Sequence, residues 1–251
     1  MNSLKANFLN ETQKMFLKSK VAACFIIAAL IPIGIALLIA LLHNKSGILA
    51  VGSTGFPVFI LGLFTSVLLP LFIFMWAADI FAGEVGEGTL KIMLVRPITR
   101  FNIYLSKIMA LSFAIILLLA VILIASLISG LLLGGSGSQY LAGLNGGIKA
   151  HILAIVPMVS LAIAAAFVAQ FFKSSSGALT SSILVYIIGR FLPIVIPMTS
   201  KVLLFSYTNW HVLWLGTALA PERLLYAFLI MLSSSIILFT AGFYLFDIKQ
   251  L

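Results

Sequence analysis

The sequence predicts an all-α membrane protein with six transmembrane helices, and three observations point to this fold class. First, 63% of the 251 residues are hydrophobic and only 8% are charged, whereas soluble domains carry roughly 25% charged residues. Second, several stretches run for about 20 residues without a charge, which is the length that crosses a bilayer core. Third, the charges lie between these stretches. Because a backbone in lipid must satisfy its own hydrogen bonds, the stretches are predicted to be helices.

Five of the predicted spans contain an uninterrupted stretch of about 20 residues without a charge, whereas the fifth in chain order is interrupted by Arg190. Counted from Ser174, a rise of about 1.5 Å per residue places Arg190 roughly 24 Å along the helix, close to the far side of the bilayer core. Arg190 is predicted to extend to that interface. The alternative is an intramembrane arginine that lines a pathway. The predicted spans are about residues 21–42, 57–80, 106–133, 151–172, 176–198 and 224–246.

Residues 1–20 are predicted to form an N-terminal amphipathic helix at the membrane interface. Leu4, Phe8, Met15 and Phe16 fall near one face of such a helix, and lysines occupy the others. A disordered basic leader is the alternative. The first apolar run is longer than a signal-peptide core and no cleavage pattern follows it, so we expect it to remain as the first span.

Two segments on the outer side are expected not to span. The glycine-rich stretch Gly134 to Gly147 is predicted to be a flexible loop. Residues 202–220 are apolar but carry polar and aromatic side chains in their middle, which is typical of a membrane interface. We interpret them as an extracellular re-entrant element between the fifth and sixth spans, with a seventh span as the alternative.

The net charge of +9 is interpreted as basic flanks that meet anionic lipid. Nucleic acid is not expected as a partner, since no basic stripe or base-stacking platform is present. With six spans, the lysines and arginines divide unequally between the two sides, and the positive-inside rule then predicts that both termini are cytoplasmic. The two sets are Lys5, Lys14, Lys18, Lys20, Lys91, Arg96, Arg100, Lys107, Lys173 and Lys249 inside, and Lys45, Lys149, Arg190, Lys201 and Arg223 outside.

No catalytic residue and no metal site are predicted. Cys24 lies within the first apolar run and is interpreted as a packing residue. His43, His151 and His211 are scattered over different segments without the spacing of metal ligands. Residues 233–235 are serines that are expected to serve helix packing. The chain contains no G-x-x-x-x-G-K-[ST] phosphate-binding motif, so ATP hydrolysis would require another subunit.

The cytoplasmic connection from Asp79 to Lys107 carries the most information about function. Thr89 is predicted to cap a short, largely apolar helix that ends before Pro97, and Thr99 is predicted to cap the helix that enters the third span. An exposed apolar helix needs a partner, either the membrane surface or another protein. Asp79 is predicted to face the lipid headgroups, with a gate or a salt bridge as the alternative.

This connection resembles that of the ABC-2 type permeases, which are the membrane subunits of ATP-binding cassette transporters. Members typically show E-x-G-T-L and then P-[VIL]-[ST]-R in the cytoplasmic loop after the second span. Either Glu84 or Glu87 takes the acidic position here. The layout of amphipathic helix, six spans and re-entrant element is similar as well. The matching residues are Glu87-Gly88-Thr89-Leu90, then Arg96-Pro97-Ile98-Thr99-Arg100, and then Lys107.

The resemblance implies that a short coupling helix near residues 87–95 docks on a cytosolic ATPase. ATP binding there would drive two permease halves between inward-open and outward-open states. Arg96 and Arg100 would pair with acidic groups of the ATPase or with lipid phosphates, or would simply anchor the loop inside. Glu87 would contact the ATPase or complement a helix dipole. The implied coupling residues are Glu84, Glu87, Gly88, Thr89, Leu90, Arg96, Pro97 and Arg100, and the possible gate or pathway residues are Asp79 and Arg190.

The function that follows from the resemblance is the permease subunit of an ATP-driven exporter in a prokaryotic plasma membrane. Its expected partners are a cytosolic ABC ATPase, a second permease chain in a homodimer or heterodimer, and membrane lipids. No cofactor is expected in this chain, whereas ATP and magnesium are expected in the ATPase. The alternatives are an ion-coupled carrier or channel, which would need ionisable groups in mid-span, and a membrane-embedded enzyme. The charge-poor interior favours an amphipathic or hydrophobic substrate over a small ion.

Overall fold

The computed structural model describes residues 3–46, 52–88, 98–134, 137–215 and 221–249. These residues form helices and turns, and no strand occurs among them. Six helices within these ranges are long and apolar enough to cross a membrane, as the sequence predicts. They are Ser19–Leu42, Phe56–Gly86, Arg100–Leu132, Gly143–Ala169, Ser175–Val195 and Pro221–Ile248.

Four of these spans lie in the single helices α2 (Ser19–Ser46), α7 (Arg100–Leu132), α8 (Gly137–Ala169) and α11 (Pro221–Ile248). The fifth span is α9 (Ser175–Val195), which is followed by the short helices η3 (Pro197–Lys201), η4 (Leu204–Tyr207) and α10 (His211–Leu215). The second span is composite and contains two π-helical segments. In order, its parts are α3 (Phe56–Leu63), η1 (Phe64–Leu68, π), α4 (Leu69–Ala77), η2 (Ala78–Gly83, π) and α5 (Glu84–Gly86).

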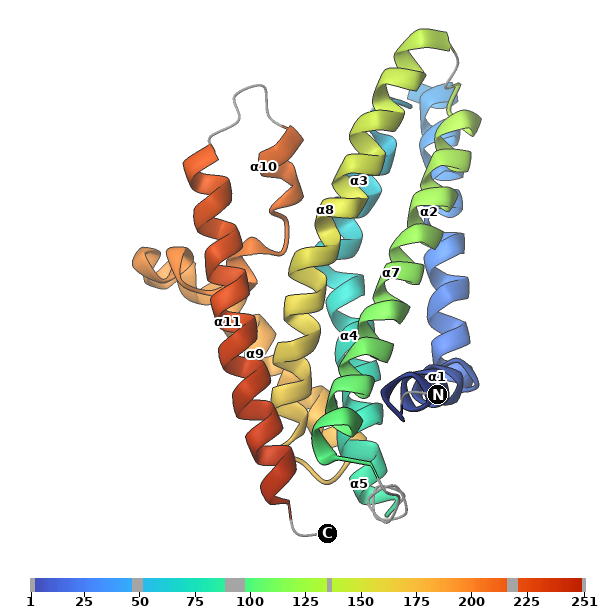
Figure 1. Ribbon diagram of the computed structural model, residues 1–251. Helices are drawn as coiled ribbons and strands as arrows, with labels where there is room; N and C mark the ends of the chain where they lie inside the picture. Colours follow the sequence, from blue (N-terminus) through green and yellow to red (C-terminus); the bar gives the residue numbers. More distant parts are fainter. Residues whose placement is uncertain (1–2, 47–51, 89–97, 135–136, 216–220, 250–251) are drawn as a thin grey trace.

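The second, third and fourth spans form the centre of the bundle. Between 50% and 56% of the most apolar window of each is buried inside the protein, against 17%, 22% and 11% for the first, fifth and sixth spans. Figure 1 shows α7, α8 and the second span in the middle, with α2 on one side and α11 and α9 on the other. The outer helices direct large apolar side chains such as Ile236 and Leu38 away from the bundle, and lipid is the solvent for such a surface.

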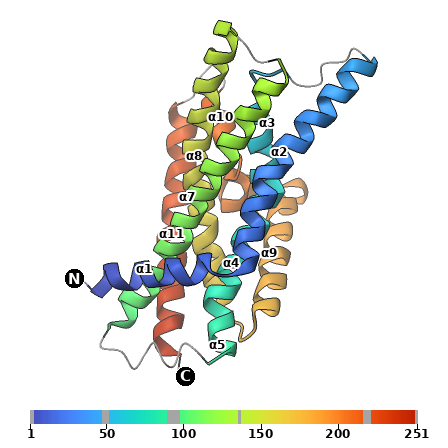
Figure 2. The same ribbon diagram turned by 90° about the vertical axis from the view of Figure 1, so that its right-hand side faces the viewer.

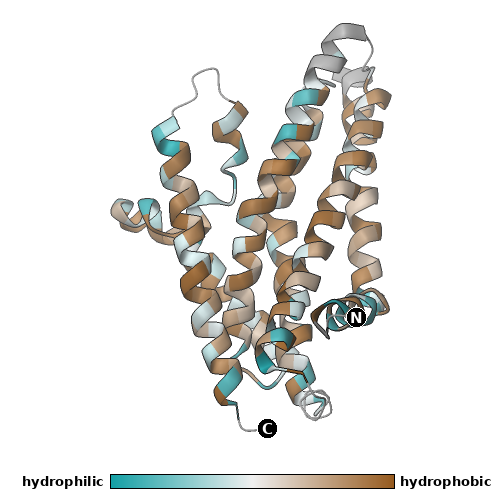
Figure 3. Cartoon of the chain, viewed as in Figure 1, coloured by the Kyte–Doolittle hydropathy of each residue, from teal (hydrophilic) through white to brown (hydrophobic). Residues whose placement is uncertain are grey.

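Helix α1 and the C-terminal end of α11 lie at the same end of the bundle as α5 (Figures 1 and 2). Figure 3 shows hydrophobic residues along the spans, with hydrophilic ones concentrated towards the helix ends and in α1 (Ser3–Phe16). Figure 2 shows α1 lying across the spans rather than along them, and α1 packs against α7. An even number of crossings places the two termini on one side of a membrane.

The prediction of a flexible loop over Gly134 to Gly147 is wrong from Gly137 onward, because α8 begins there. At Gly143, an added Cβ would lie 2.7 Å from the carbonyl oxygen of Thr54. At Gly147 it would lie 3.0 Å from Pro57. These glycines let α8 approach the start of the second span closely, which is a packing role that composition alone does not distinguish from flexibility.

Two helix starts show how local sequence sets the boundaries. The Thr99 side chain accepts a hydrogen bond from the backbone N–H of Asn102, so the predicted cap of the third span is confirmed. Ser174 caps α9 in the same way by accepting from Gly177. Such caps satisfy backbone N–H groups that have no partner inside the helix.

Candidate functional site

A buried cluster of lysines and glutamates lies at the end of the bundle that carries both termini. Lys107, on α7, is fully buried, and its Nζ lies 2.5 Å from Oε2 of Glu84 and 2.8 Å from Oε2 of Glu11. Lys14 Nζ lies 3.5 Å from Oε1 of Glu84 and 3.6 Å from Oε1 of Glu11. We call Glu11, Lys14, Glu84 and Lys107 the lysine–glutamate cluster. It joins α1, the end of the second span and the start of the third.

Burial makes the two contacts of Lys107 the strong ones in the cluster. The side chains of Lys107, Glu11 and Glu84 are 0%, 3% and 10% exposed, whereas Lys14 is 41% exposed. Exposed ion pairs contribute little, because water and salt screen them. A buried charge that loses its partner is strongly destabilising, at about 3 to 5 kcal/mol. The three elements are therefore expected to hold together as long as Lys107 keeps both carboxylates.

A neutral hydrogen bond extends the attachment of α1 to α7. The Nδ2 atom of Asn7 donates to Oγ of Ser106, the residue before Lys107, over 2.6 Å. Asn7, Glu11 and Met15 are the buried positions of α1, and they follow one another at the four-residue spacing of a single helical face. The sequence predicts an apolar face for this helix, whereas the face that packs on the protein is partly polar.

At the end of the second span, the two candidates for the acidic position of the coupling motif have different environments. Glu84 is buried, with its side chain in the cluster, whereas Glu87 is exposed. Gly88 follows with a positive φ of 69°, a conformation that favours glycine and ends α5. Gly86 packs so closely on the turn between α8 and α9 that an added Cβ would lie 2.5 Å from the Lys173 carbonyl oxygen.

The predicted coupling helix lies outside the described residues, as do Thr89, Leu90, Arg96 and Pro97. Arg100 is described and stands at the first position of α7. Its Nη1 donates a hydrogen bond to the carbonyl oxygen of Asp247, at the end of α11. The start of the third span is thereby tied to the end of the sixth.

A second contact holds the same end of α11. Lys249 Nζ donates to Oε1 of Gln170 over 3.0 Å, which connects the chain after the sixth span to the chain after the fourth. Burial lowers the pKa of Lys249 from 10.5 to about 8. The end of the sixth span is thus attached to the start of the third span and to the end of the fourth.

Asp79 lies in the π-helical segment η2 and forms an ion pair with Lys20 at 3.3 Å. This is the salt bridge that the sequence offers as the alternative to a headgroup contact. Lys20 is 59% exposed, so the pair is expected to be screened and weak. It connects the start of α2 to the second span beside the lysine–glutamate cluster.

A shallow cleft of about 190 Å³ opens between α1 and the end of the second span. Glu11, Lys14 and Glu84 form part of its lining, and Glu87 and Lys18 are charged residues that line it as well. The cleft therefore presents charges of both signs next to the connection between the second and third spans. It is suited to a polar partner rather than to a lipid chain.

A separate polar contact joins the π-helical segment η1 to the chain after α9. Thr65 Oγ1 lies 2.7 Å from Oδ1 of Asn209, whose Nδ2 donates to Oγ of Ser66 over 3.1 Å. The Ser66 carbonyl oxygen accepts a hydrogen bond from the Tyr186 hydroxyl over 2.8 Å. A π-helical turn disturbs the regular backbone ladder, and such turns are frequent at functional sites.

Arg190 is directed towards η4. Its Nη1 donates to the carbonyl oxygen of Phe205 and to Oγ1 of Thr208, each over 3.2 Å. The absence of a side chain at Gly189 permits this approach, since an added Cβ would collide with the Phe205 ring. The predicted pathway residues Asp79, on the second span, and Arg190, on α9, therefore belong to two different sites.

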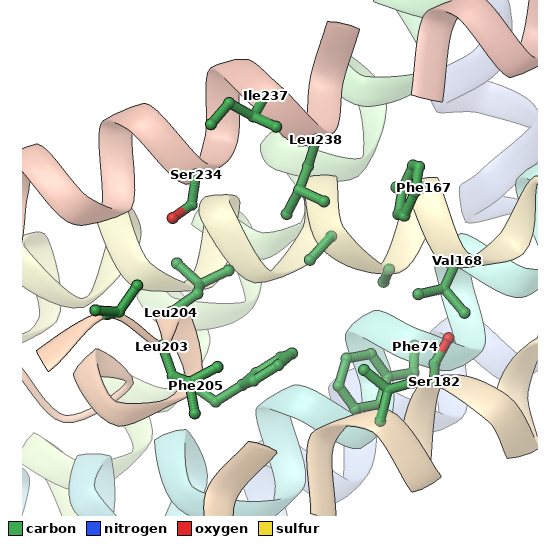
Figure 4. Close-up of a pocket in the computed structure, with 14 residues that line it drawn as sticks. Phe74, Phe167, Val168, Ser182, Leu203, Leu204, Phe205, Ser234, Ile237 and Leu238 are labelled. Atoms are coloured by element: carbon green, nitrogen blue, oxygen red, sulfur yellow. The ribbon is translucent and has the colours of Figure 1, made fainter. Parts of the chain in front are cut away.

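An apolar cavity of about 360 Å³ lies between α8, α9, α11 and η4. Figure 4 shows Phe167, Ile237 and Leu238 on one side of it, with Phe74 and Phe205 on the other. Ser182 and Ser234 contribute hydroxyl groups. The size and lining are those of a site for a small hydrophobic molecule.

Sequence reasoning missed Glu11 and the buried role of Lys107, which it counted among the basic flanks. One signal was available, because the chain has only six acidic residues and Glu11 stands on a helix otherwise basic. The pairing itself could not be predicted, since 96 positions separate Glu11 from Lys107 in the sequence. A single sequence does not indicate which distant charges meet.

Comparison with known proteins matches residues 8–190 to a family model described as "ABC-2 family transporter protein". The matched range contains the whole lysine–glutamate cluster and ends at Arg190. The chain is also similar to the "Uncharacterized protein YhcI" of Bacillus subtilis (strain 168), with 35% identity over 80 residues, or 32% of this chain. The match spans 26% of the length of that relative.

Proposed function

We propose, from the premise that this chain belongs to the ABC-2 family of transporter proteins, that it is the permease subunit of an ATP-driven exporter. Proteins of this family are membrane components of ABC transporters, so ATP and magnesium bind in a separate ATPase. The multi-pass character follows from the six apolar helices. The proposal places the protein in a prokaryotic plasma membrane with the ATPase on its cytoplasmic side.

The observation that carries the proposal is the lysine–glutamate cluster. Glu84 precedes the connection between the second and third spans, and Lys107 follows it, so their contact fastens the two flanks of that connection together. Glu11 adds α1 to the same unit. A force applied to the connection by an ATPase would move α5, α7 and α1 together, because a buried charge that is left without its partner is strongly destabilising.

Glu84 and Glu87 take different parts in this proposal. Glu84 stabilises the unit from within, and Glu87, which is exposed, contacts the ATPase. The short helix from Thr89 to Val95 docks on the ATPase, Gly88 provides the turn into it and Pro97 ends it. Arg96 and Arg100 face acidic groups of the ATPase or lipid phosphates.

The membrane arrangement is part of the proposal. Both termini are cytoplasmic, in line with the unequal distribution of lysine and arginine, and α1 lies at the cytoplasmic interface. The predicted re-entrant element, residues 202–220, belongs on the extracellular side, and the hydrogen bonds of Asn209 to η1 support this for its described part. A second permease chain completes the pathway, since a single six-span chain is small for enclosing one.

The test is to co-express the chain with its ATPase and to measure co-purification and ATP hydrolysis in lipid vesicles. The complex is expected to hydrolyse ATP faster than the ATPase alone. Glu87→Gln is expected to lower this stimulation while thermal stability is kept. Glu222→Gln is the matched control, because Glu222 is exposed at the opposite end of the bundle.

Two results would contradict the proposal. One is stimulation that Glu87→Gln and Glu87→Lys leave unchanged, which would remove Glu87 from the interface. The other is substrate transport by the chain in vesicles that contain no ATPase, which would favour an ion-coupled carrier. Direction is read by adding ATP outside inverted vesicles, where an exporter accumulates substrate in the lumen.

A further inference from the structure

An apolar groove of about 390 Å³ runs between the second span and α9, separate from the cavity of Figure 4. Val67 and Leu71 form one wall and Ile183 and Ile187 form the other, with Arg190 also in the lining. Val67, Leu71 and Ile187 are 62%, 41% and 44% exposed. Figure 2 shows α9 beside α4 at the edge of the bundle. The groove therefore opens on the surface that faces lipid.

Arg190 brings an unpaired positive charge to this groove. All six acidic residues of the chain lie within the described ranges, and none of them forms an ion pair with Arg190. Its Nη1 donates to two neutral oxygen atoms. The remaining donors, Nε and Nη2, have no hydrogen-bond partner among the described residues. A charge without a counter-ion inside a membrane span is costly and marks a binding site or pathway.

We propose that this groove binds an anionic phospholipid from the surrounding bilayer, with its phosphate on Arg190 and one acyl chain along the apolar walls. The guanidinium fork matches the oxygen atoms of a phosphate and can bind two of them at once. The wall from Ile183 to Arg190 extends for about 10 Å, which provides an apolar surface beneath the headgroup. The site is independent of the proposed coupling to an ATPase.

The chemistry of the groove selects this occupant. A zwitterionic lipid would fill the apolar walls, but its own cation would leave the net charge of Arg190 uncompensated. A small free anion would pair with Arg190 and leave the apolar groove unused. An anionic phospholipid satisfies both parts.

The test uses the purified full chain in mixed micelles, titrated with phosphatidylglycerol or with phosphatidylcholine of the same acyl chains. Bound lipid is counted by native mass spectrometry. A photoreactive side chain at position 67 reports whether lipid or protein occupies the groove. Phosphatidylglycerol is expected to bind about tenfold more tightly to the wild type than to Arg190→Gln, the effect of losing one charged hydrogen-bonding pair. Phosphatidylcholine has a phosphate as well, but its choline cation cancels the net charge, so it is expected to bind the wild type more weakly and to lose less affinity in Arg190→Gln.

Three variants make the result specific. Arg223→Gln removes an exposed arginine at the start of α11 and is expected to bind phosphatidylglycerol as the wild type does. Arg190→Lys keeps the charge without the fork and is expected to bind with intermediate affinity. Ile187→Trp fills the groove without removing the hydrogen bonds of Arg190 to η4 and is expected to weaken binding. This variant keeps the test valid should Arg190→Gln fail to fold.

The proposal is overturned if the wild type binds the two lipids equally, or if Arg190→Gln and Ile187→Trp both bind phosphatidylglycerol as the wild type does. It is also overturned if the photoreactive residue links two protein chains instead of a lipid. That last outcome would identify the groove as an interface between two copies.

Discussion

The Nζ atom of Lys107 lies 2.5 Å from Oε2 of Glu84, and this contact closes the connection between the second and third spans at its base. Both side chains are buried, and Glu11 of α1 supplies a second carboxylate to the same lysine. A helix that crosses the bundle is thus attached to the two spans that flank the connection. One buried ammonium group thus contacts carboxylates from two other elements at this end of the bundle.

Replacing Lys107 by methionine is expected to lower the free energy of unfolding by about 3 to 5 kcal/mol, because it leaves two buried carboxylates without their shared cation. The measurement is thermal or denaturant unfolding of the purified protein in detergent. Lys5→Met is the control, since Lys5 is exposed on α1. A variant as stable as the control would show that the buried contacts contribute nothing.

The double variant Lys107→Met with Glu84→Gln distinguishes the loss of the Lys107–Glu84 contact from non-specific destabilisation of the fold. Neutralising the carboxylate is expected to restore part of the stability lost in Lys107→Met, so that the two changes are not additive. Additive losses would mean that Lys107 and Glu84 do not stabilise each other.

Gly86→Ala is expected to destabilise the protein by about 1 to 3 kcal/mol, the range for added volume at a well-packed site. The new Cβ would lie 2.5 Å from the Lys173 carbonyl oxygen, so backbone must move. Gly62→Ala in the same span is the matched control, because no atom lies within 4 Å of its added Cβ. The control is expected to be neutral or stabilising by up to about 1 kcal/mol. Equal thermal midpoints for the two variants would refute the close packing of α5.

Asn209→Leu is expected to loosen the chain after α9 by removing its hydrogen bonds to Thr65 and Ser66. Interhelical hydrogen bonds in membranes contribute about 0.6 kcal/mol on average and at most about 1.7. A cycle with Thr65→Val measures the coupling directly. Proteolysis of the segment between α9 and α11 is expected to be faster in the variant, and an unchanged rate together with zero coupling would contradict the contact.

Because His211 is buried, we expect the folded protein to lose stability in acid. The histidine is fully buried on α10, and burial, with a smaller contribution from the neighbouring His151, lowers the pKa of His211 from 6.5 to about 4. Between these values the unfolded chain binds a proton that the folded protein excludes, so stability falls as the pH falls from about 6.5 towards 4. Unfolding midpoints measured across this range check the prediction. His211→Phe is expected to flatten the pH dependence, and an unchanged slope would exclude His211 as its source.

The spans could be predicted from sequence because the length and apolarity of a run are local properties. The Thr99 cap was predictable for the same reason, since a capping side chain acts within three residues of itself. The glycine-rich stretch before the fourth span misled the prediction. Glycine provides flexibility in one context and close helix packing in another, and only the partner backbone at Thr54 decides between them.

The polar contacts of the candidate site were not predictable to the same degree. The sequence identified Glu84 and Glu87 as alternatives for one role, and burial separates them: one faces the interior and the other is exposed. The meeting of Glu11 with Lys107 and of Thr65 with Asn209 depends on how the helices pack and rotate. Positions 96 and 144 apart in the sequence come together only in the fold.

The two π-helical segments of the second span determine in which direction around the helix axis its side chains point. Thr65 stands in η1, and Glu84 directly follows η2, so the direction of each side chain depends on the wide turns around it. An α-helix turns roughly 100° per residue. Shortening η2 by a single residue would therefore rotate Glu84 away from Lys107 by about that angle while leaving Thr65 in place. The second span therefore fixes how the polar side chains at its two ends are oriented relative to each other. For this orientation, the number of residues in the span matters as much as their composition.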